Sequence, residues 1–171
     1  MKLKLSDWAS IAEVIGAIAI VVSLIYVGIQ VNDSTRAVRS ATANETSAAL
    51  SSWYSSIGAS AQASEVFYNG VTDPGSLSIE ETAQFIYLIH GLFIEYQAAY
   101  YLGQEQTLDE GVQESITNTL VGVREQPGVL MYWEQRRDLF EPGFRRFFDD
   151  LIATGSTNTN LETLYRLRDS Q

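Results

Sequence analysis

Residues 8–31, WASIAEVIGAIAIVVSLIYVGIQV, decide how this chain is organised. Residues 14–32 carry no charged side chain, and most of them are Val, Ile, Ala or Leu. At about 1.5 Å rise per residue, a helix of this length covers roughly 30 Å, which is the thickness of the hydrocarbon core of a bilayer. We therefore predict a transmembrane helix over residues 8–31, after a short basic N-terminus at residues 1–7.

Two other interpretations of this run are a cleaved signal peptide and a buried helix of a soluble protein. Lys2 and Lys4 would supply the basic start of a signal peptide. However, the apolar run is longer than usual for such a peptide, and no clear A-x-A cleavage site follows it. A soluble protein would have to cover apolar surface on every side of the helix. The sequence therefore favours an uncleaved membrane anchor.

Length, charge and cysteine content limit what the rest of the chain can be. The protein has 171 residues, and removal of the anchor leaves about 135, enough for one domain with its own core. The formal net charge is −10, and most of the acidic excess follows the anchor, which disfavours nucleic acid as a partner. There is no cysteine, so disulfides, thiolate metal sites and cysteine nucleophiles are excluded.

Beyond the anchor, the chain has the pattern of helices separated by turns, without sustained strand alternation. Residues 32–68 are rich in Ala and Ser and contain no proline, so we predict that the membrane helix continues into a stalk helix, with Gly58 as a potential kink. Ser78 and Glu81 have the spacing of a capping box, and Gly103 is predicted to end the helix that follows. The prediction is an all-α fold: an N-terminal transmembrane helix that continues into a long stalk helix (32–68), followed by a small helical bundle (69–171).

Further signals divide the predicted bundle. Residues 107–110, TLDE, form a second capping-box pattern. Pro127 is predicted to open another helix, because proline is tolerated in the first turn. Residues 141–143, EPG, separate that helix from one over residues 144–152. Asn160 is predicted to cap a last short helix that ends at Arg168.

A seam of small residues, which become polar at its end, runs along one side of the predicted membrane helix. Its members recur at spacings of three and four: Ala9, Ala12, Gly16, Ala19, Ser23, Tyr26 and Gln30. Small seams allow two helix backbones to approach closely in lipid. The seam therefore predicts self-association into a homo-oligomer or contact with other membrane-protein subunits, and a pore lined by its polar end is an alternative.

Aromatic residues crowd the helix that follows Ser78. Tyr87, His90, Tyr96 and Tyr100 are candidates for an aromatic-lined pocket for a small molecule, and core packing of the same rings is the alternative. His90 is the only histidine and has no Glu three residues before it, so it lacks the Glu-x-x-His pattern of metal-binding bundles. We expect no catalytic residues, no metal and no cofactor, and hence not an enzyme.

One basic cluster stands out in the acidic domain. Its members are Trp133, Arg136, Arg137, Arg145 and Arg146, which lie close in sequence to several carboxylates. Surface salt bridges to those carboxylates are one interpretation. The other is a contact surface for lipid headgroups or for a neighbouring subunit.

Both ends of the chain resemble a known group of proteins. The residues that carry the resemblance are the anchor from Ala12 to Val31, then Asn32, Thr35 and Arg36, and later Tyr132, Trp133, Arg136, Arg137, Leu139, Phe140, Pro142, Phe144, Arg145 and Asp149. They resemble uncharacterised single-pass membrane proteins that are widespread in proteobacteria. The resemblance implies a bacterial inner-membrane protein and no particular reaction. It also favours a cytoplasmic domain, whereas the basic start and acidic domain favour the outside; we expect the cytoplasmic side.

These observations together predict a membrane-anchored helical protein with a structural or interaction role. It would self-associate through its transmembrane helix or act as an accessory subunit of a membrane assembly. A sensory or small-molecule-binding module with an aromatic pocket in the bundle is the alternative. Its expected partners are the lipid membrane and other copies or subunits.

Overall fold

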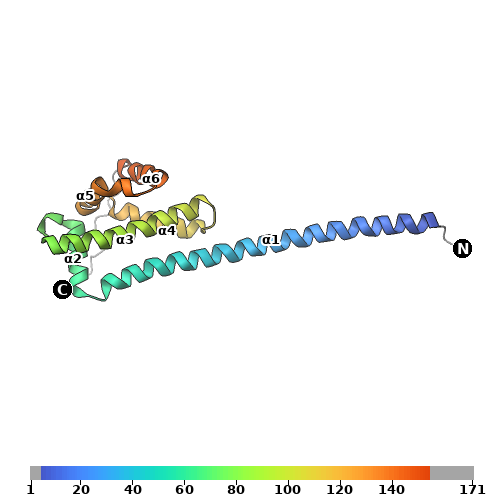
Figure 1. Cartoon of the computed structure of the whole chain (residues 1–171), viewed down its shortest axis with the longest axis horizontal. Coiled ribbons are helices and arrows are strands. Elements are labelled where there is room, and N and C mark those ends of the chain that lie inside the picture. The colour runs from blue at the N-terminus through green and yellow to red at the C-terminus, as the bar shows by residue number, and fades with distance from the viewer. Residues whose placement is uncertain (1–4, 155–171) are drawn as a thin grey trace, which may run out of the picture. The chain divides into compact units, whose positions relative to one another are not determined.

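A single long helix, α1 (Leu5–Gly58), begins the protein in the computed structural model, which describes residues 5–154 (Figure 1). It passes without interruption from the predicted membrane segment into the predicted stalk. This continuity was expected because neither Pro nor Gly occurs between Val31 and Ile57. The chain divides into two compact units, residues 1–40 and 41–171, and each is described by itself.

The first unit consists of the N-terminal part of α1. Every side chain described in this part is exposed, including those of Ile20, Leu24 and Ile25. By length and composition, α1 is suited to cross a membrane. Exposure of this apolar surface of α1 to water is unfavourable, whereas its exposure to hydrocarbon is favourable. Residues 1–4 of the predicted basic N-terminus lie outside the described part of the chain.

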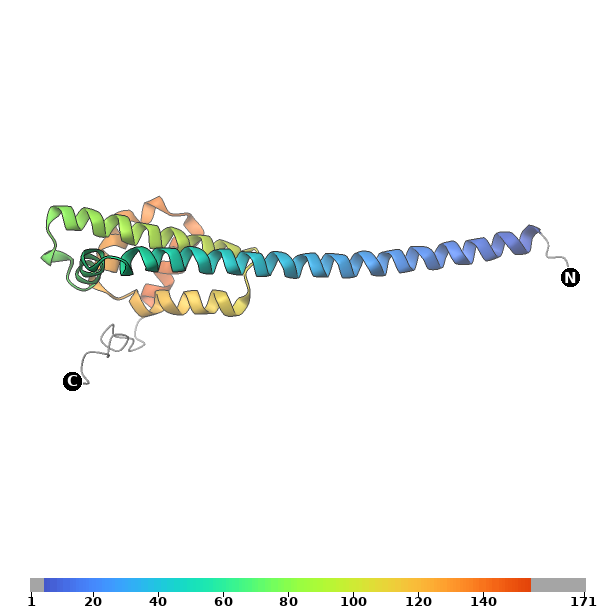
Figure 2. The same ribbon diagram turned by 90° about the horizontal axis from the view of Figure 1, so that it is seen from below.

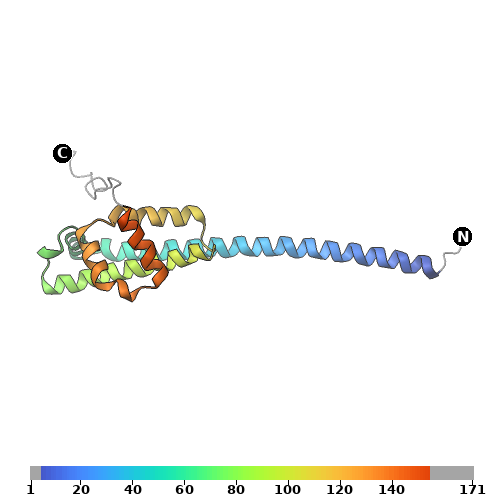
Figure 3. The ribbon, with the colours of Figure 1, turned by 90° about the horizontal axis from the view of Figure 1, so that it is seen from above.

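The second unit is a bundle of helices around α3. It contains the end of α1 together with α2 (Ala61–Thr72), η1 (Pro74–Ser76), α3 (Ile79–Gln104), α4 (Glu110–Val123), α5 (Pro127–Arg136), η2 (Arg137–Leu139) and α6 (Pro142–Ala153). Helix α3 contacts α2, α4, α5 and α6. Figure 2 shows the end of α1 alongside α3, and Figure 3 shows α6, in red, crossing α3. Residues 5–154 contain no strand, so the predicted all-α fold is confirmed.

The core of the bundle is built mainly from aromatic rings. Phe93 of α3 is fully buried, and its ring centroid lies within 6.5 Å of the centroids of six other rings: those of Tyr96, Tyr132, Trp133, Phe140, Phe144 and Phe148. Several of these pairs meet edge to face, which is favourable for the ring quadrupoles. The rings join α3, α5 and α6 in one core.

Two glycines bring α2 and α5 into direct backbone contact. A Cβ atom built on Gly128 would lie 1.8 Å from the carbonyl oxygen of Gly70. A Cβ atom on Gly70 would lie 2.2 Å from the ring of Phe85. Neither position has room for a side chain, so Gly128 is required by tertiary packing as well as by the turn that the sequence predicts.

Two helices, α3 and α5, begin where the sequence predicts. At the start of α3, the Glu81 N–H donates to Ser78 Oγ (3.2 Å) and the Ser78 N–H donates to a Glu81 carboxylate oxygen (2.8 Å), so the predicted capping box is confirmed. Pro127 is the first residue of α5, as predicted. The local pattern was sufficient here because a cap involves only neighbours in sequence.

The second predicted capping box is wrong. The N-cap of α4 is Asp109, whose carboxylate accepts from the Gly111 and Val112 N–H groups, whereas the Thr107 hydroxyl donates to the Leu102 carbonyl. Thr107 instead closes the turn that follows α3. That turn also includes Gln106, whose backbone φ of 55° is a left-handed conformation that residues other than glycine rarely adopt.

The predicted stalk at residues 32–68 differs from the structure in two respects. Helix α1 ends at Gly58, and the Ser60 hydroxyl accepts from the Ala63 N–H to cap α2, so residues 61–68 belong to α2. From Ala41 onward α1 is part of the bundle unit, where Trp53 and its neighbours pack against the core. The sequence did not indicate this packing, because the stripe of this helix that faces the core consists mostly of small residues. The predicted helix from Asn160 to Arg168 lies outside the described residues.

A candidate ligand-binding cavity in the helical bundle

A cavity of about 600 Å³ lies among the helices of the second unit. Five helices contribute to its wall. The residues that line it are Trp53, Tyr54 and Ile57 of α1; Ser64, Phe67, Tyr68 and Val71 of α2; Ile89, Leu92, Phe93 and Tyr96 of α3; Asn118, Thr119, Gly122 and Val123 of α4; and Val129 of α5. Most of this lining is apolar or aromatic, and none of it is charged.

Helical periodicity places the α3 part of the wall. Ile89, Leu92, Phe93 and Tyr96 follow the i, i+3, i+4, i+7 spacing of one helix face, and all four are buried. The same stripe therefore forms both the bundle core and the cavity wall.

Trp53 of α1 forms another part of the wall. Its indole N–H donates to the Leu88 carbonyl of α3 at 2.9 Å, and its ring meets that of Phe67 edge to face with centroids 5.1 Å apart. The hydrogen bond holds the end of α1 against α3. The sequence signal for this role was a single Trp in a segment that is otherwise rich in Ala and Ser.

Exposed polar residues border the cavity on one side. Tyr54, Tyr68, Asn118 and Thr119 are all exposed, whereas the rest of the lining is buried or half-buried. The cavity therefore opens to the surface between α1, α2 and α4. Apolar depth with a few polar groups at the mouth is the usual composition of a small-molecule site.

One polar group stands out in the lining. The Tyr96 hydroxyl is buried and has no hydrogen-bond partner among the described residues. Burial raises the pKa of Tyr96, and the neighbouring Tyr54 phenol, which interacts with it, contributes further. The Tyr96 phenol is therefore neutral at physiological pH.

The structure separates the four predicted pocket residues. Tyr96 lines the cavity, but Tyr87 is 77% exposed and lies outside it. His90 Nδ1 lies 2.5 Å from the Tyr132 hydroxyl and does not line the cavity. Tyr100 borders a second cavity of about 10 Å³, too small to hold more than a water molecule. The prediction thus included one residue of the large cavity and missed the rest, most of which come from other helices.

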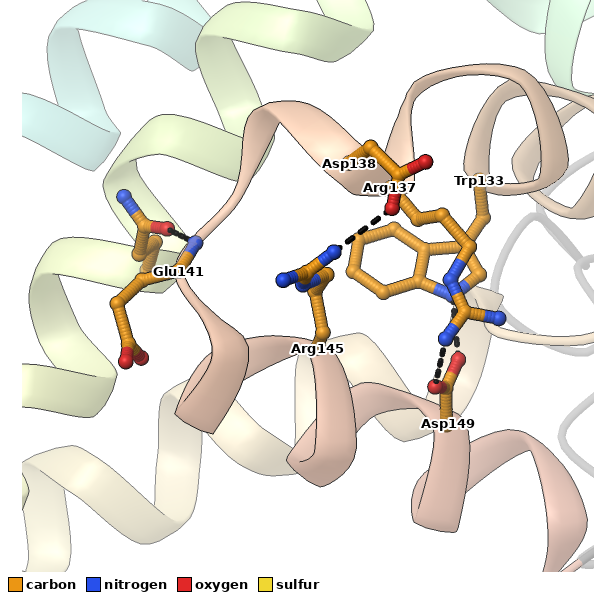
Figure 4. Close-up of polar contacts among 7 residues, drawn as sticks. Trp133, Arg137, Asp138, Glu141, Arg145 and Asp149 are labelled. Carbon is orange, nitrogen blue, oxygen red and sulfur yellow. Dashed lines mark hydrogen bonds and ion pairs between the residues drawn. The ribbon is translucent and has the colours of Figure 1, made fainter.

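The predicted basic cluster is largely occupied by internal contacts (Figure 4). Trp133 is buried, and its indole N–H donates to Asp149 at 2.8 Å, so this residue is not available as a surface contact. Arg137 pairs with the same carboxylate at 2.6 Å, and Arg145 pairs with Asp138 at 2.7 Å. These contacts agree with the salt-bridge interpretation for those two arginines.

Two further arginines of the cluster have a different setting. Arg136 and Arg146 are exposed. Arg146 contributes to a lowered pKa of Glu141, whose main cause is a hydrogen bond from the Tyr101 hydroxyl. Arg137 is exposed as well, although it pairs with Asp149, so three of the four arginines face solvent.

The predicted helix-packing seam lies on the exposed part of α1. From Ala12 to Gln30 its described members are exposed, and a Cβ atom on Gly16 would meet nothing within 4 Å. The side chain of Ala9 lies outside the described residues. Within residues 5–154, no group of three or more His, Cys, Asp or Glu side chains is placed to hold a metal ion.

Comparison with known proteins gives no match: no family model, no curated protein and no solved structure is similar to this chain.

Proposed function

We propose that this protein is a membrane-anchored module that binds a small apolar molecule in the cavity of its helical bundle. The observation that carries the proposal is the cavity of about 600 Å³ with its apolar and aromatic lining. Protein cores pack as densely as organic crystals, and an unfilled cavity costs stability in proportion to its size. Ligand sites, in contrast, commonly have volumes of about 300–1,000 Å³.

The anchor is the second part of the proposal. The exposed apolar surface of α1 supports insertion into a lipid bilayer. The resemblance of both chain ends to proteobacterial single-pass proteins supports an inner-membrane location with the bundle on the cytoplasmic side. A membrane-anchored bundle would meet ligands that partition into lipid.

A thermal-shift screen of the full chain in detergent tests ligand binding. Lipids and apolar metabolites are the compounds to screen, since a ligand at one hundred times its Kd stabilises the folded state by about 2.7 kcal/mol. Val123→Phe would place a ring in the cavity, because Val123 lines it. Val121→Phe is the matched control, because Val121 is half-buried on the same helix and is not in the lining.

Compounds that stabilise the wild-type protein and V121F should leave V123F unchanged. A screen that finds no stabilising compound would contradict the proposal. Equal stabilisation of V123F would show that the compounds bind elsewhere, and this also contradicts it.

A second candidate function is self-association through the seam, or contact of the seam with another membrane subunit. It is favoured by the open space around Gly16 and the exposure of the described seam residues in the single chain. Gly16→Ile and Ala19→Ile should reduce crosslinking in detergent, whereas Ala17→Ile, which lies off the seam, should not. Unchanged crosslinking in G16I and A19I, or a monomeric wild-type protein, would exclude self-association. Copurification from native membranes then identifies any other subunit.

A further inference from the structure

Four aromatic rings of α1 and α2 line one part of the large cavity, and we call them the aromatic rim: Trp53, Tyr54, Phe67 and Tyr68. None of the four lines the second, small cavity. Tyr54 is 52% and Tyr68 is 51% exposed, so these two rings lie at the mouth, whereas Trp53 and Phe67 are half-buried. A ligand that enters the cavity from this side therefore passes aromatic side chains first.

The rings of the aromatic rim stand nearly at right angles to one another. The ring centroids of Tyr54 and Phe67 each lie 5.1 Å from that of Trp53, and their planes are at 80° and 79° to its plane. Such a cluster presents ring faces as well as ring edges to its surroundings. The face of an aromatic ring carries partial negative charge and attracts a cation, most notably a quaternary ammonium group.

The charged side chains of the helices that surround the mouth are acidic. Within residues 41–58, 61–72 and 110–123, all of which the structure describes, they are Glu45, Glu65, Glu110 and Glu114. Arg124 follows α4, but it is buried, it is not part of the lining, and its Nε lies 3.6 Å from the carboxylate of Glu125. This distribution of charge favours a positive ligand group over a negative one at the mouth.

The wall also offers an anion little compensation for lost water. It contains no Lys, Arg or His. The Trp53 indole N–H and the hydroxyls of Ser64 and Thr119 donate to main-chain carbonyls of α3, α1 and α4, at 2.9, 2.9 and 3.1 Å. A carboxylate or phosphate would therefore lose hydration without gaining a cation or these donors. A quaternary ammonium group needs neither, because it makes no hydrogen bonds of its own.

The depth of the cavity is suited to an apolar body. The side chains that line it away from the aromatic rim include Ile57, Val71, Ile89, Leu92, Phe93 and Val129, and all six are buried. An apolar cavity of about 150 Å³ is large enough to hold benzene, and this cavity has about four times that volume. Contact with these side chains would remove an alkyl chain or a ring system from water.

We infer that the ligand is an amphipathic cation, whose apolar body fills the depth of the cavity and whose quaternary ammonium group lies among the rings of the aromatic rim; the inference rests on the proposed function. At the mouth the ammonium group keeps part of its hydration and gains the attraction of the ring faces. The same rings also provide apolar contact for the start of the ligand's body.

Three probes with the same decyl chain separate the charge of the head from its shape. They are decyltrimethylammonium; its neutral isostere, in which a tert-butyl group replaces the trimethylammonium group; and decanesulfonate, which is anionic. Thermal stabilisation of the full chain in a nonionic detergent measures the affinity of each probe, at free probe concentrations determined by equilibrium dialysis. The variants are Tyr68→Leu, which removes one ring of the aromatic rim, and Tyr68→Phe, which keeps it. Tyr87→Leu is the control, because Tyr87 is exposed and lines neither cavity.

A contact between a cation and an exposed ring corresponds to about two- to fivefold in affinity. We therefore expect Y68L to weaken the binding of decyltrimethylammonium by about that factor and to leave the neutral isostere unchanged. Y68F and Y87L should bind both probes as the wild-type protein does, and decanesulfonate should bind more weakly than the cation. The N-methyl protons of bound decyltrimethylammonium should show an upfield ring-current shift that is smaller in Y68L.

The outcomes distinguish the inference from the proposed function. If the cation and the isostere both bind in a manner sensitive to V123F, and Y68L affects the two equally or not at all, the cationic head is wrong and the cavity remains a binding site. If decanesulfonate binds as tightly as the cation, the charge preference is wrong. If none of the three probes binds while the screen of lipids and apolar metabolites finds compounds sensitive to V123F, the inference alone fails. If that screen finds none either, the proposed function fails with it.

Discussion

Replacement of Gly128 by alanine should force apart two backbones that are in contact. The added Cβ would lie 1.8 Å from the Gly70 carbonyl oxygen and 3.0 Å from the Cα of Val71. In proteins, a Cβ atom essentially never lies less than 3.0 Å from a non-bonded heavy atom outside its own stretch of backbone. Either α2 or α5 must therefore move by more than 1 Å at this contact, and both are packed on α3.

The expected cost is large because the obstacle is main chain and cannot rotate away. Overpacking of a core costs about 1–3 kcal/mol, and a backbone obstacle favours the upper end of that range. Alanine regains up to about 1 kcal/mol through its higher helix propensity. The net loss in free energy of unfolding is about 2 kcal/mol, which for a protein of this size corresponds to a fall in Tm of roughly 4–8 °C.

Thermal unfolding of the full chain in detergent, followed by circular dichroism, measures this effect. Gly58→Ala is the matched control, because a Cβ atom on Gly58 would meet nothing within 4 Å and its φ is not positive. We expect G58A to be as stable as the wild-type protein or more stable. If G128A unfolds at the wild-type temperature, the close contact between α2 and α5 does not exist in solution.

Two further predictions concern polar groups. A hydrogen bond from the Tyr101 hydroxyl, with contributions from two backbone N–H groups and Arg146, holds the pKa of Glu141 below its usual 4.5, although desolvation of the carboxyl acts in the opposite direction. The contribution of Glu141 to stability is therefore present above pH 4.5 and is lost as the pH falls through the lowered pKa. Glu141→Gln should remove that part of the acid dependence in urea unfolding. In the absence of ligand, Tyr96→Phe should leave stability unchanged or raise it by up to about 1–3 kcal/mol, because it removes a buried hydroxyl without a partner, and a loss measured by thermal unfolding would show that the hydroxyl is already bonded.

The features that the sequence predicted correctly depend on neighbours along the chain. The long apolar run, the absence of Pro and Gly between Val31 and Ile57, and the capping box at Ser78 each involve residues within a few turns of a helix. The sequence analysis predicted Thr107 as the cap of α4, but Asp109 caps it in the structure, and both residue types accept hydrogen bonds at helix starts. The local sequence permitted either residue to cap α4, and the turn that follows α3 determined which one does.

The candidate site could be predicted only in part. Helical spacing placed Tyr96 on the inner face of α3, and the crowding of aromatic residues indicated a pocket there. Spacing could not reveal that Trp53, distant in sequence, would form part of the wall, or that Tyr87 would face solvent at 77% exposure. The order of helices around α3 determines which faces meet, and that order is a non-local property.

By itself, the sequence determined that this chain is helical and that one of its helices is suited to cross a bilayer, because periodicity, capping and hydrophobic length act along a single helix. Only the tertiary structure decided where the helices leave space between them. The contact between Gly70 and Gly128 sets the approach of α2 and α5, and the hydrogen bond from Trp53 to Leu88 holds α1 against α3. The cavity is bounded by side chains from five helices, so its volume and its lining exist only once those helices have packed.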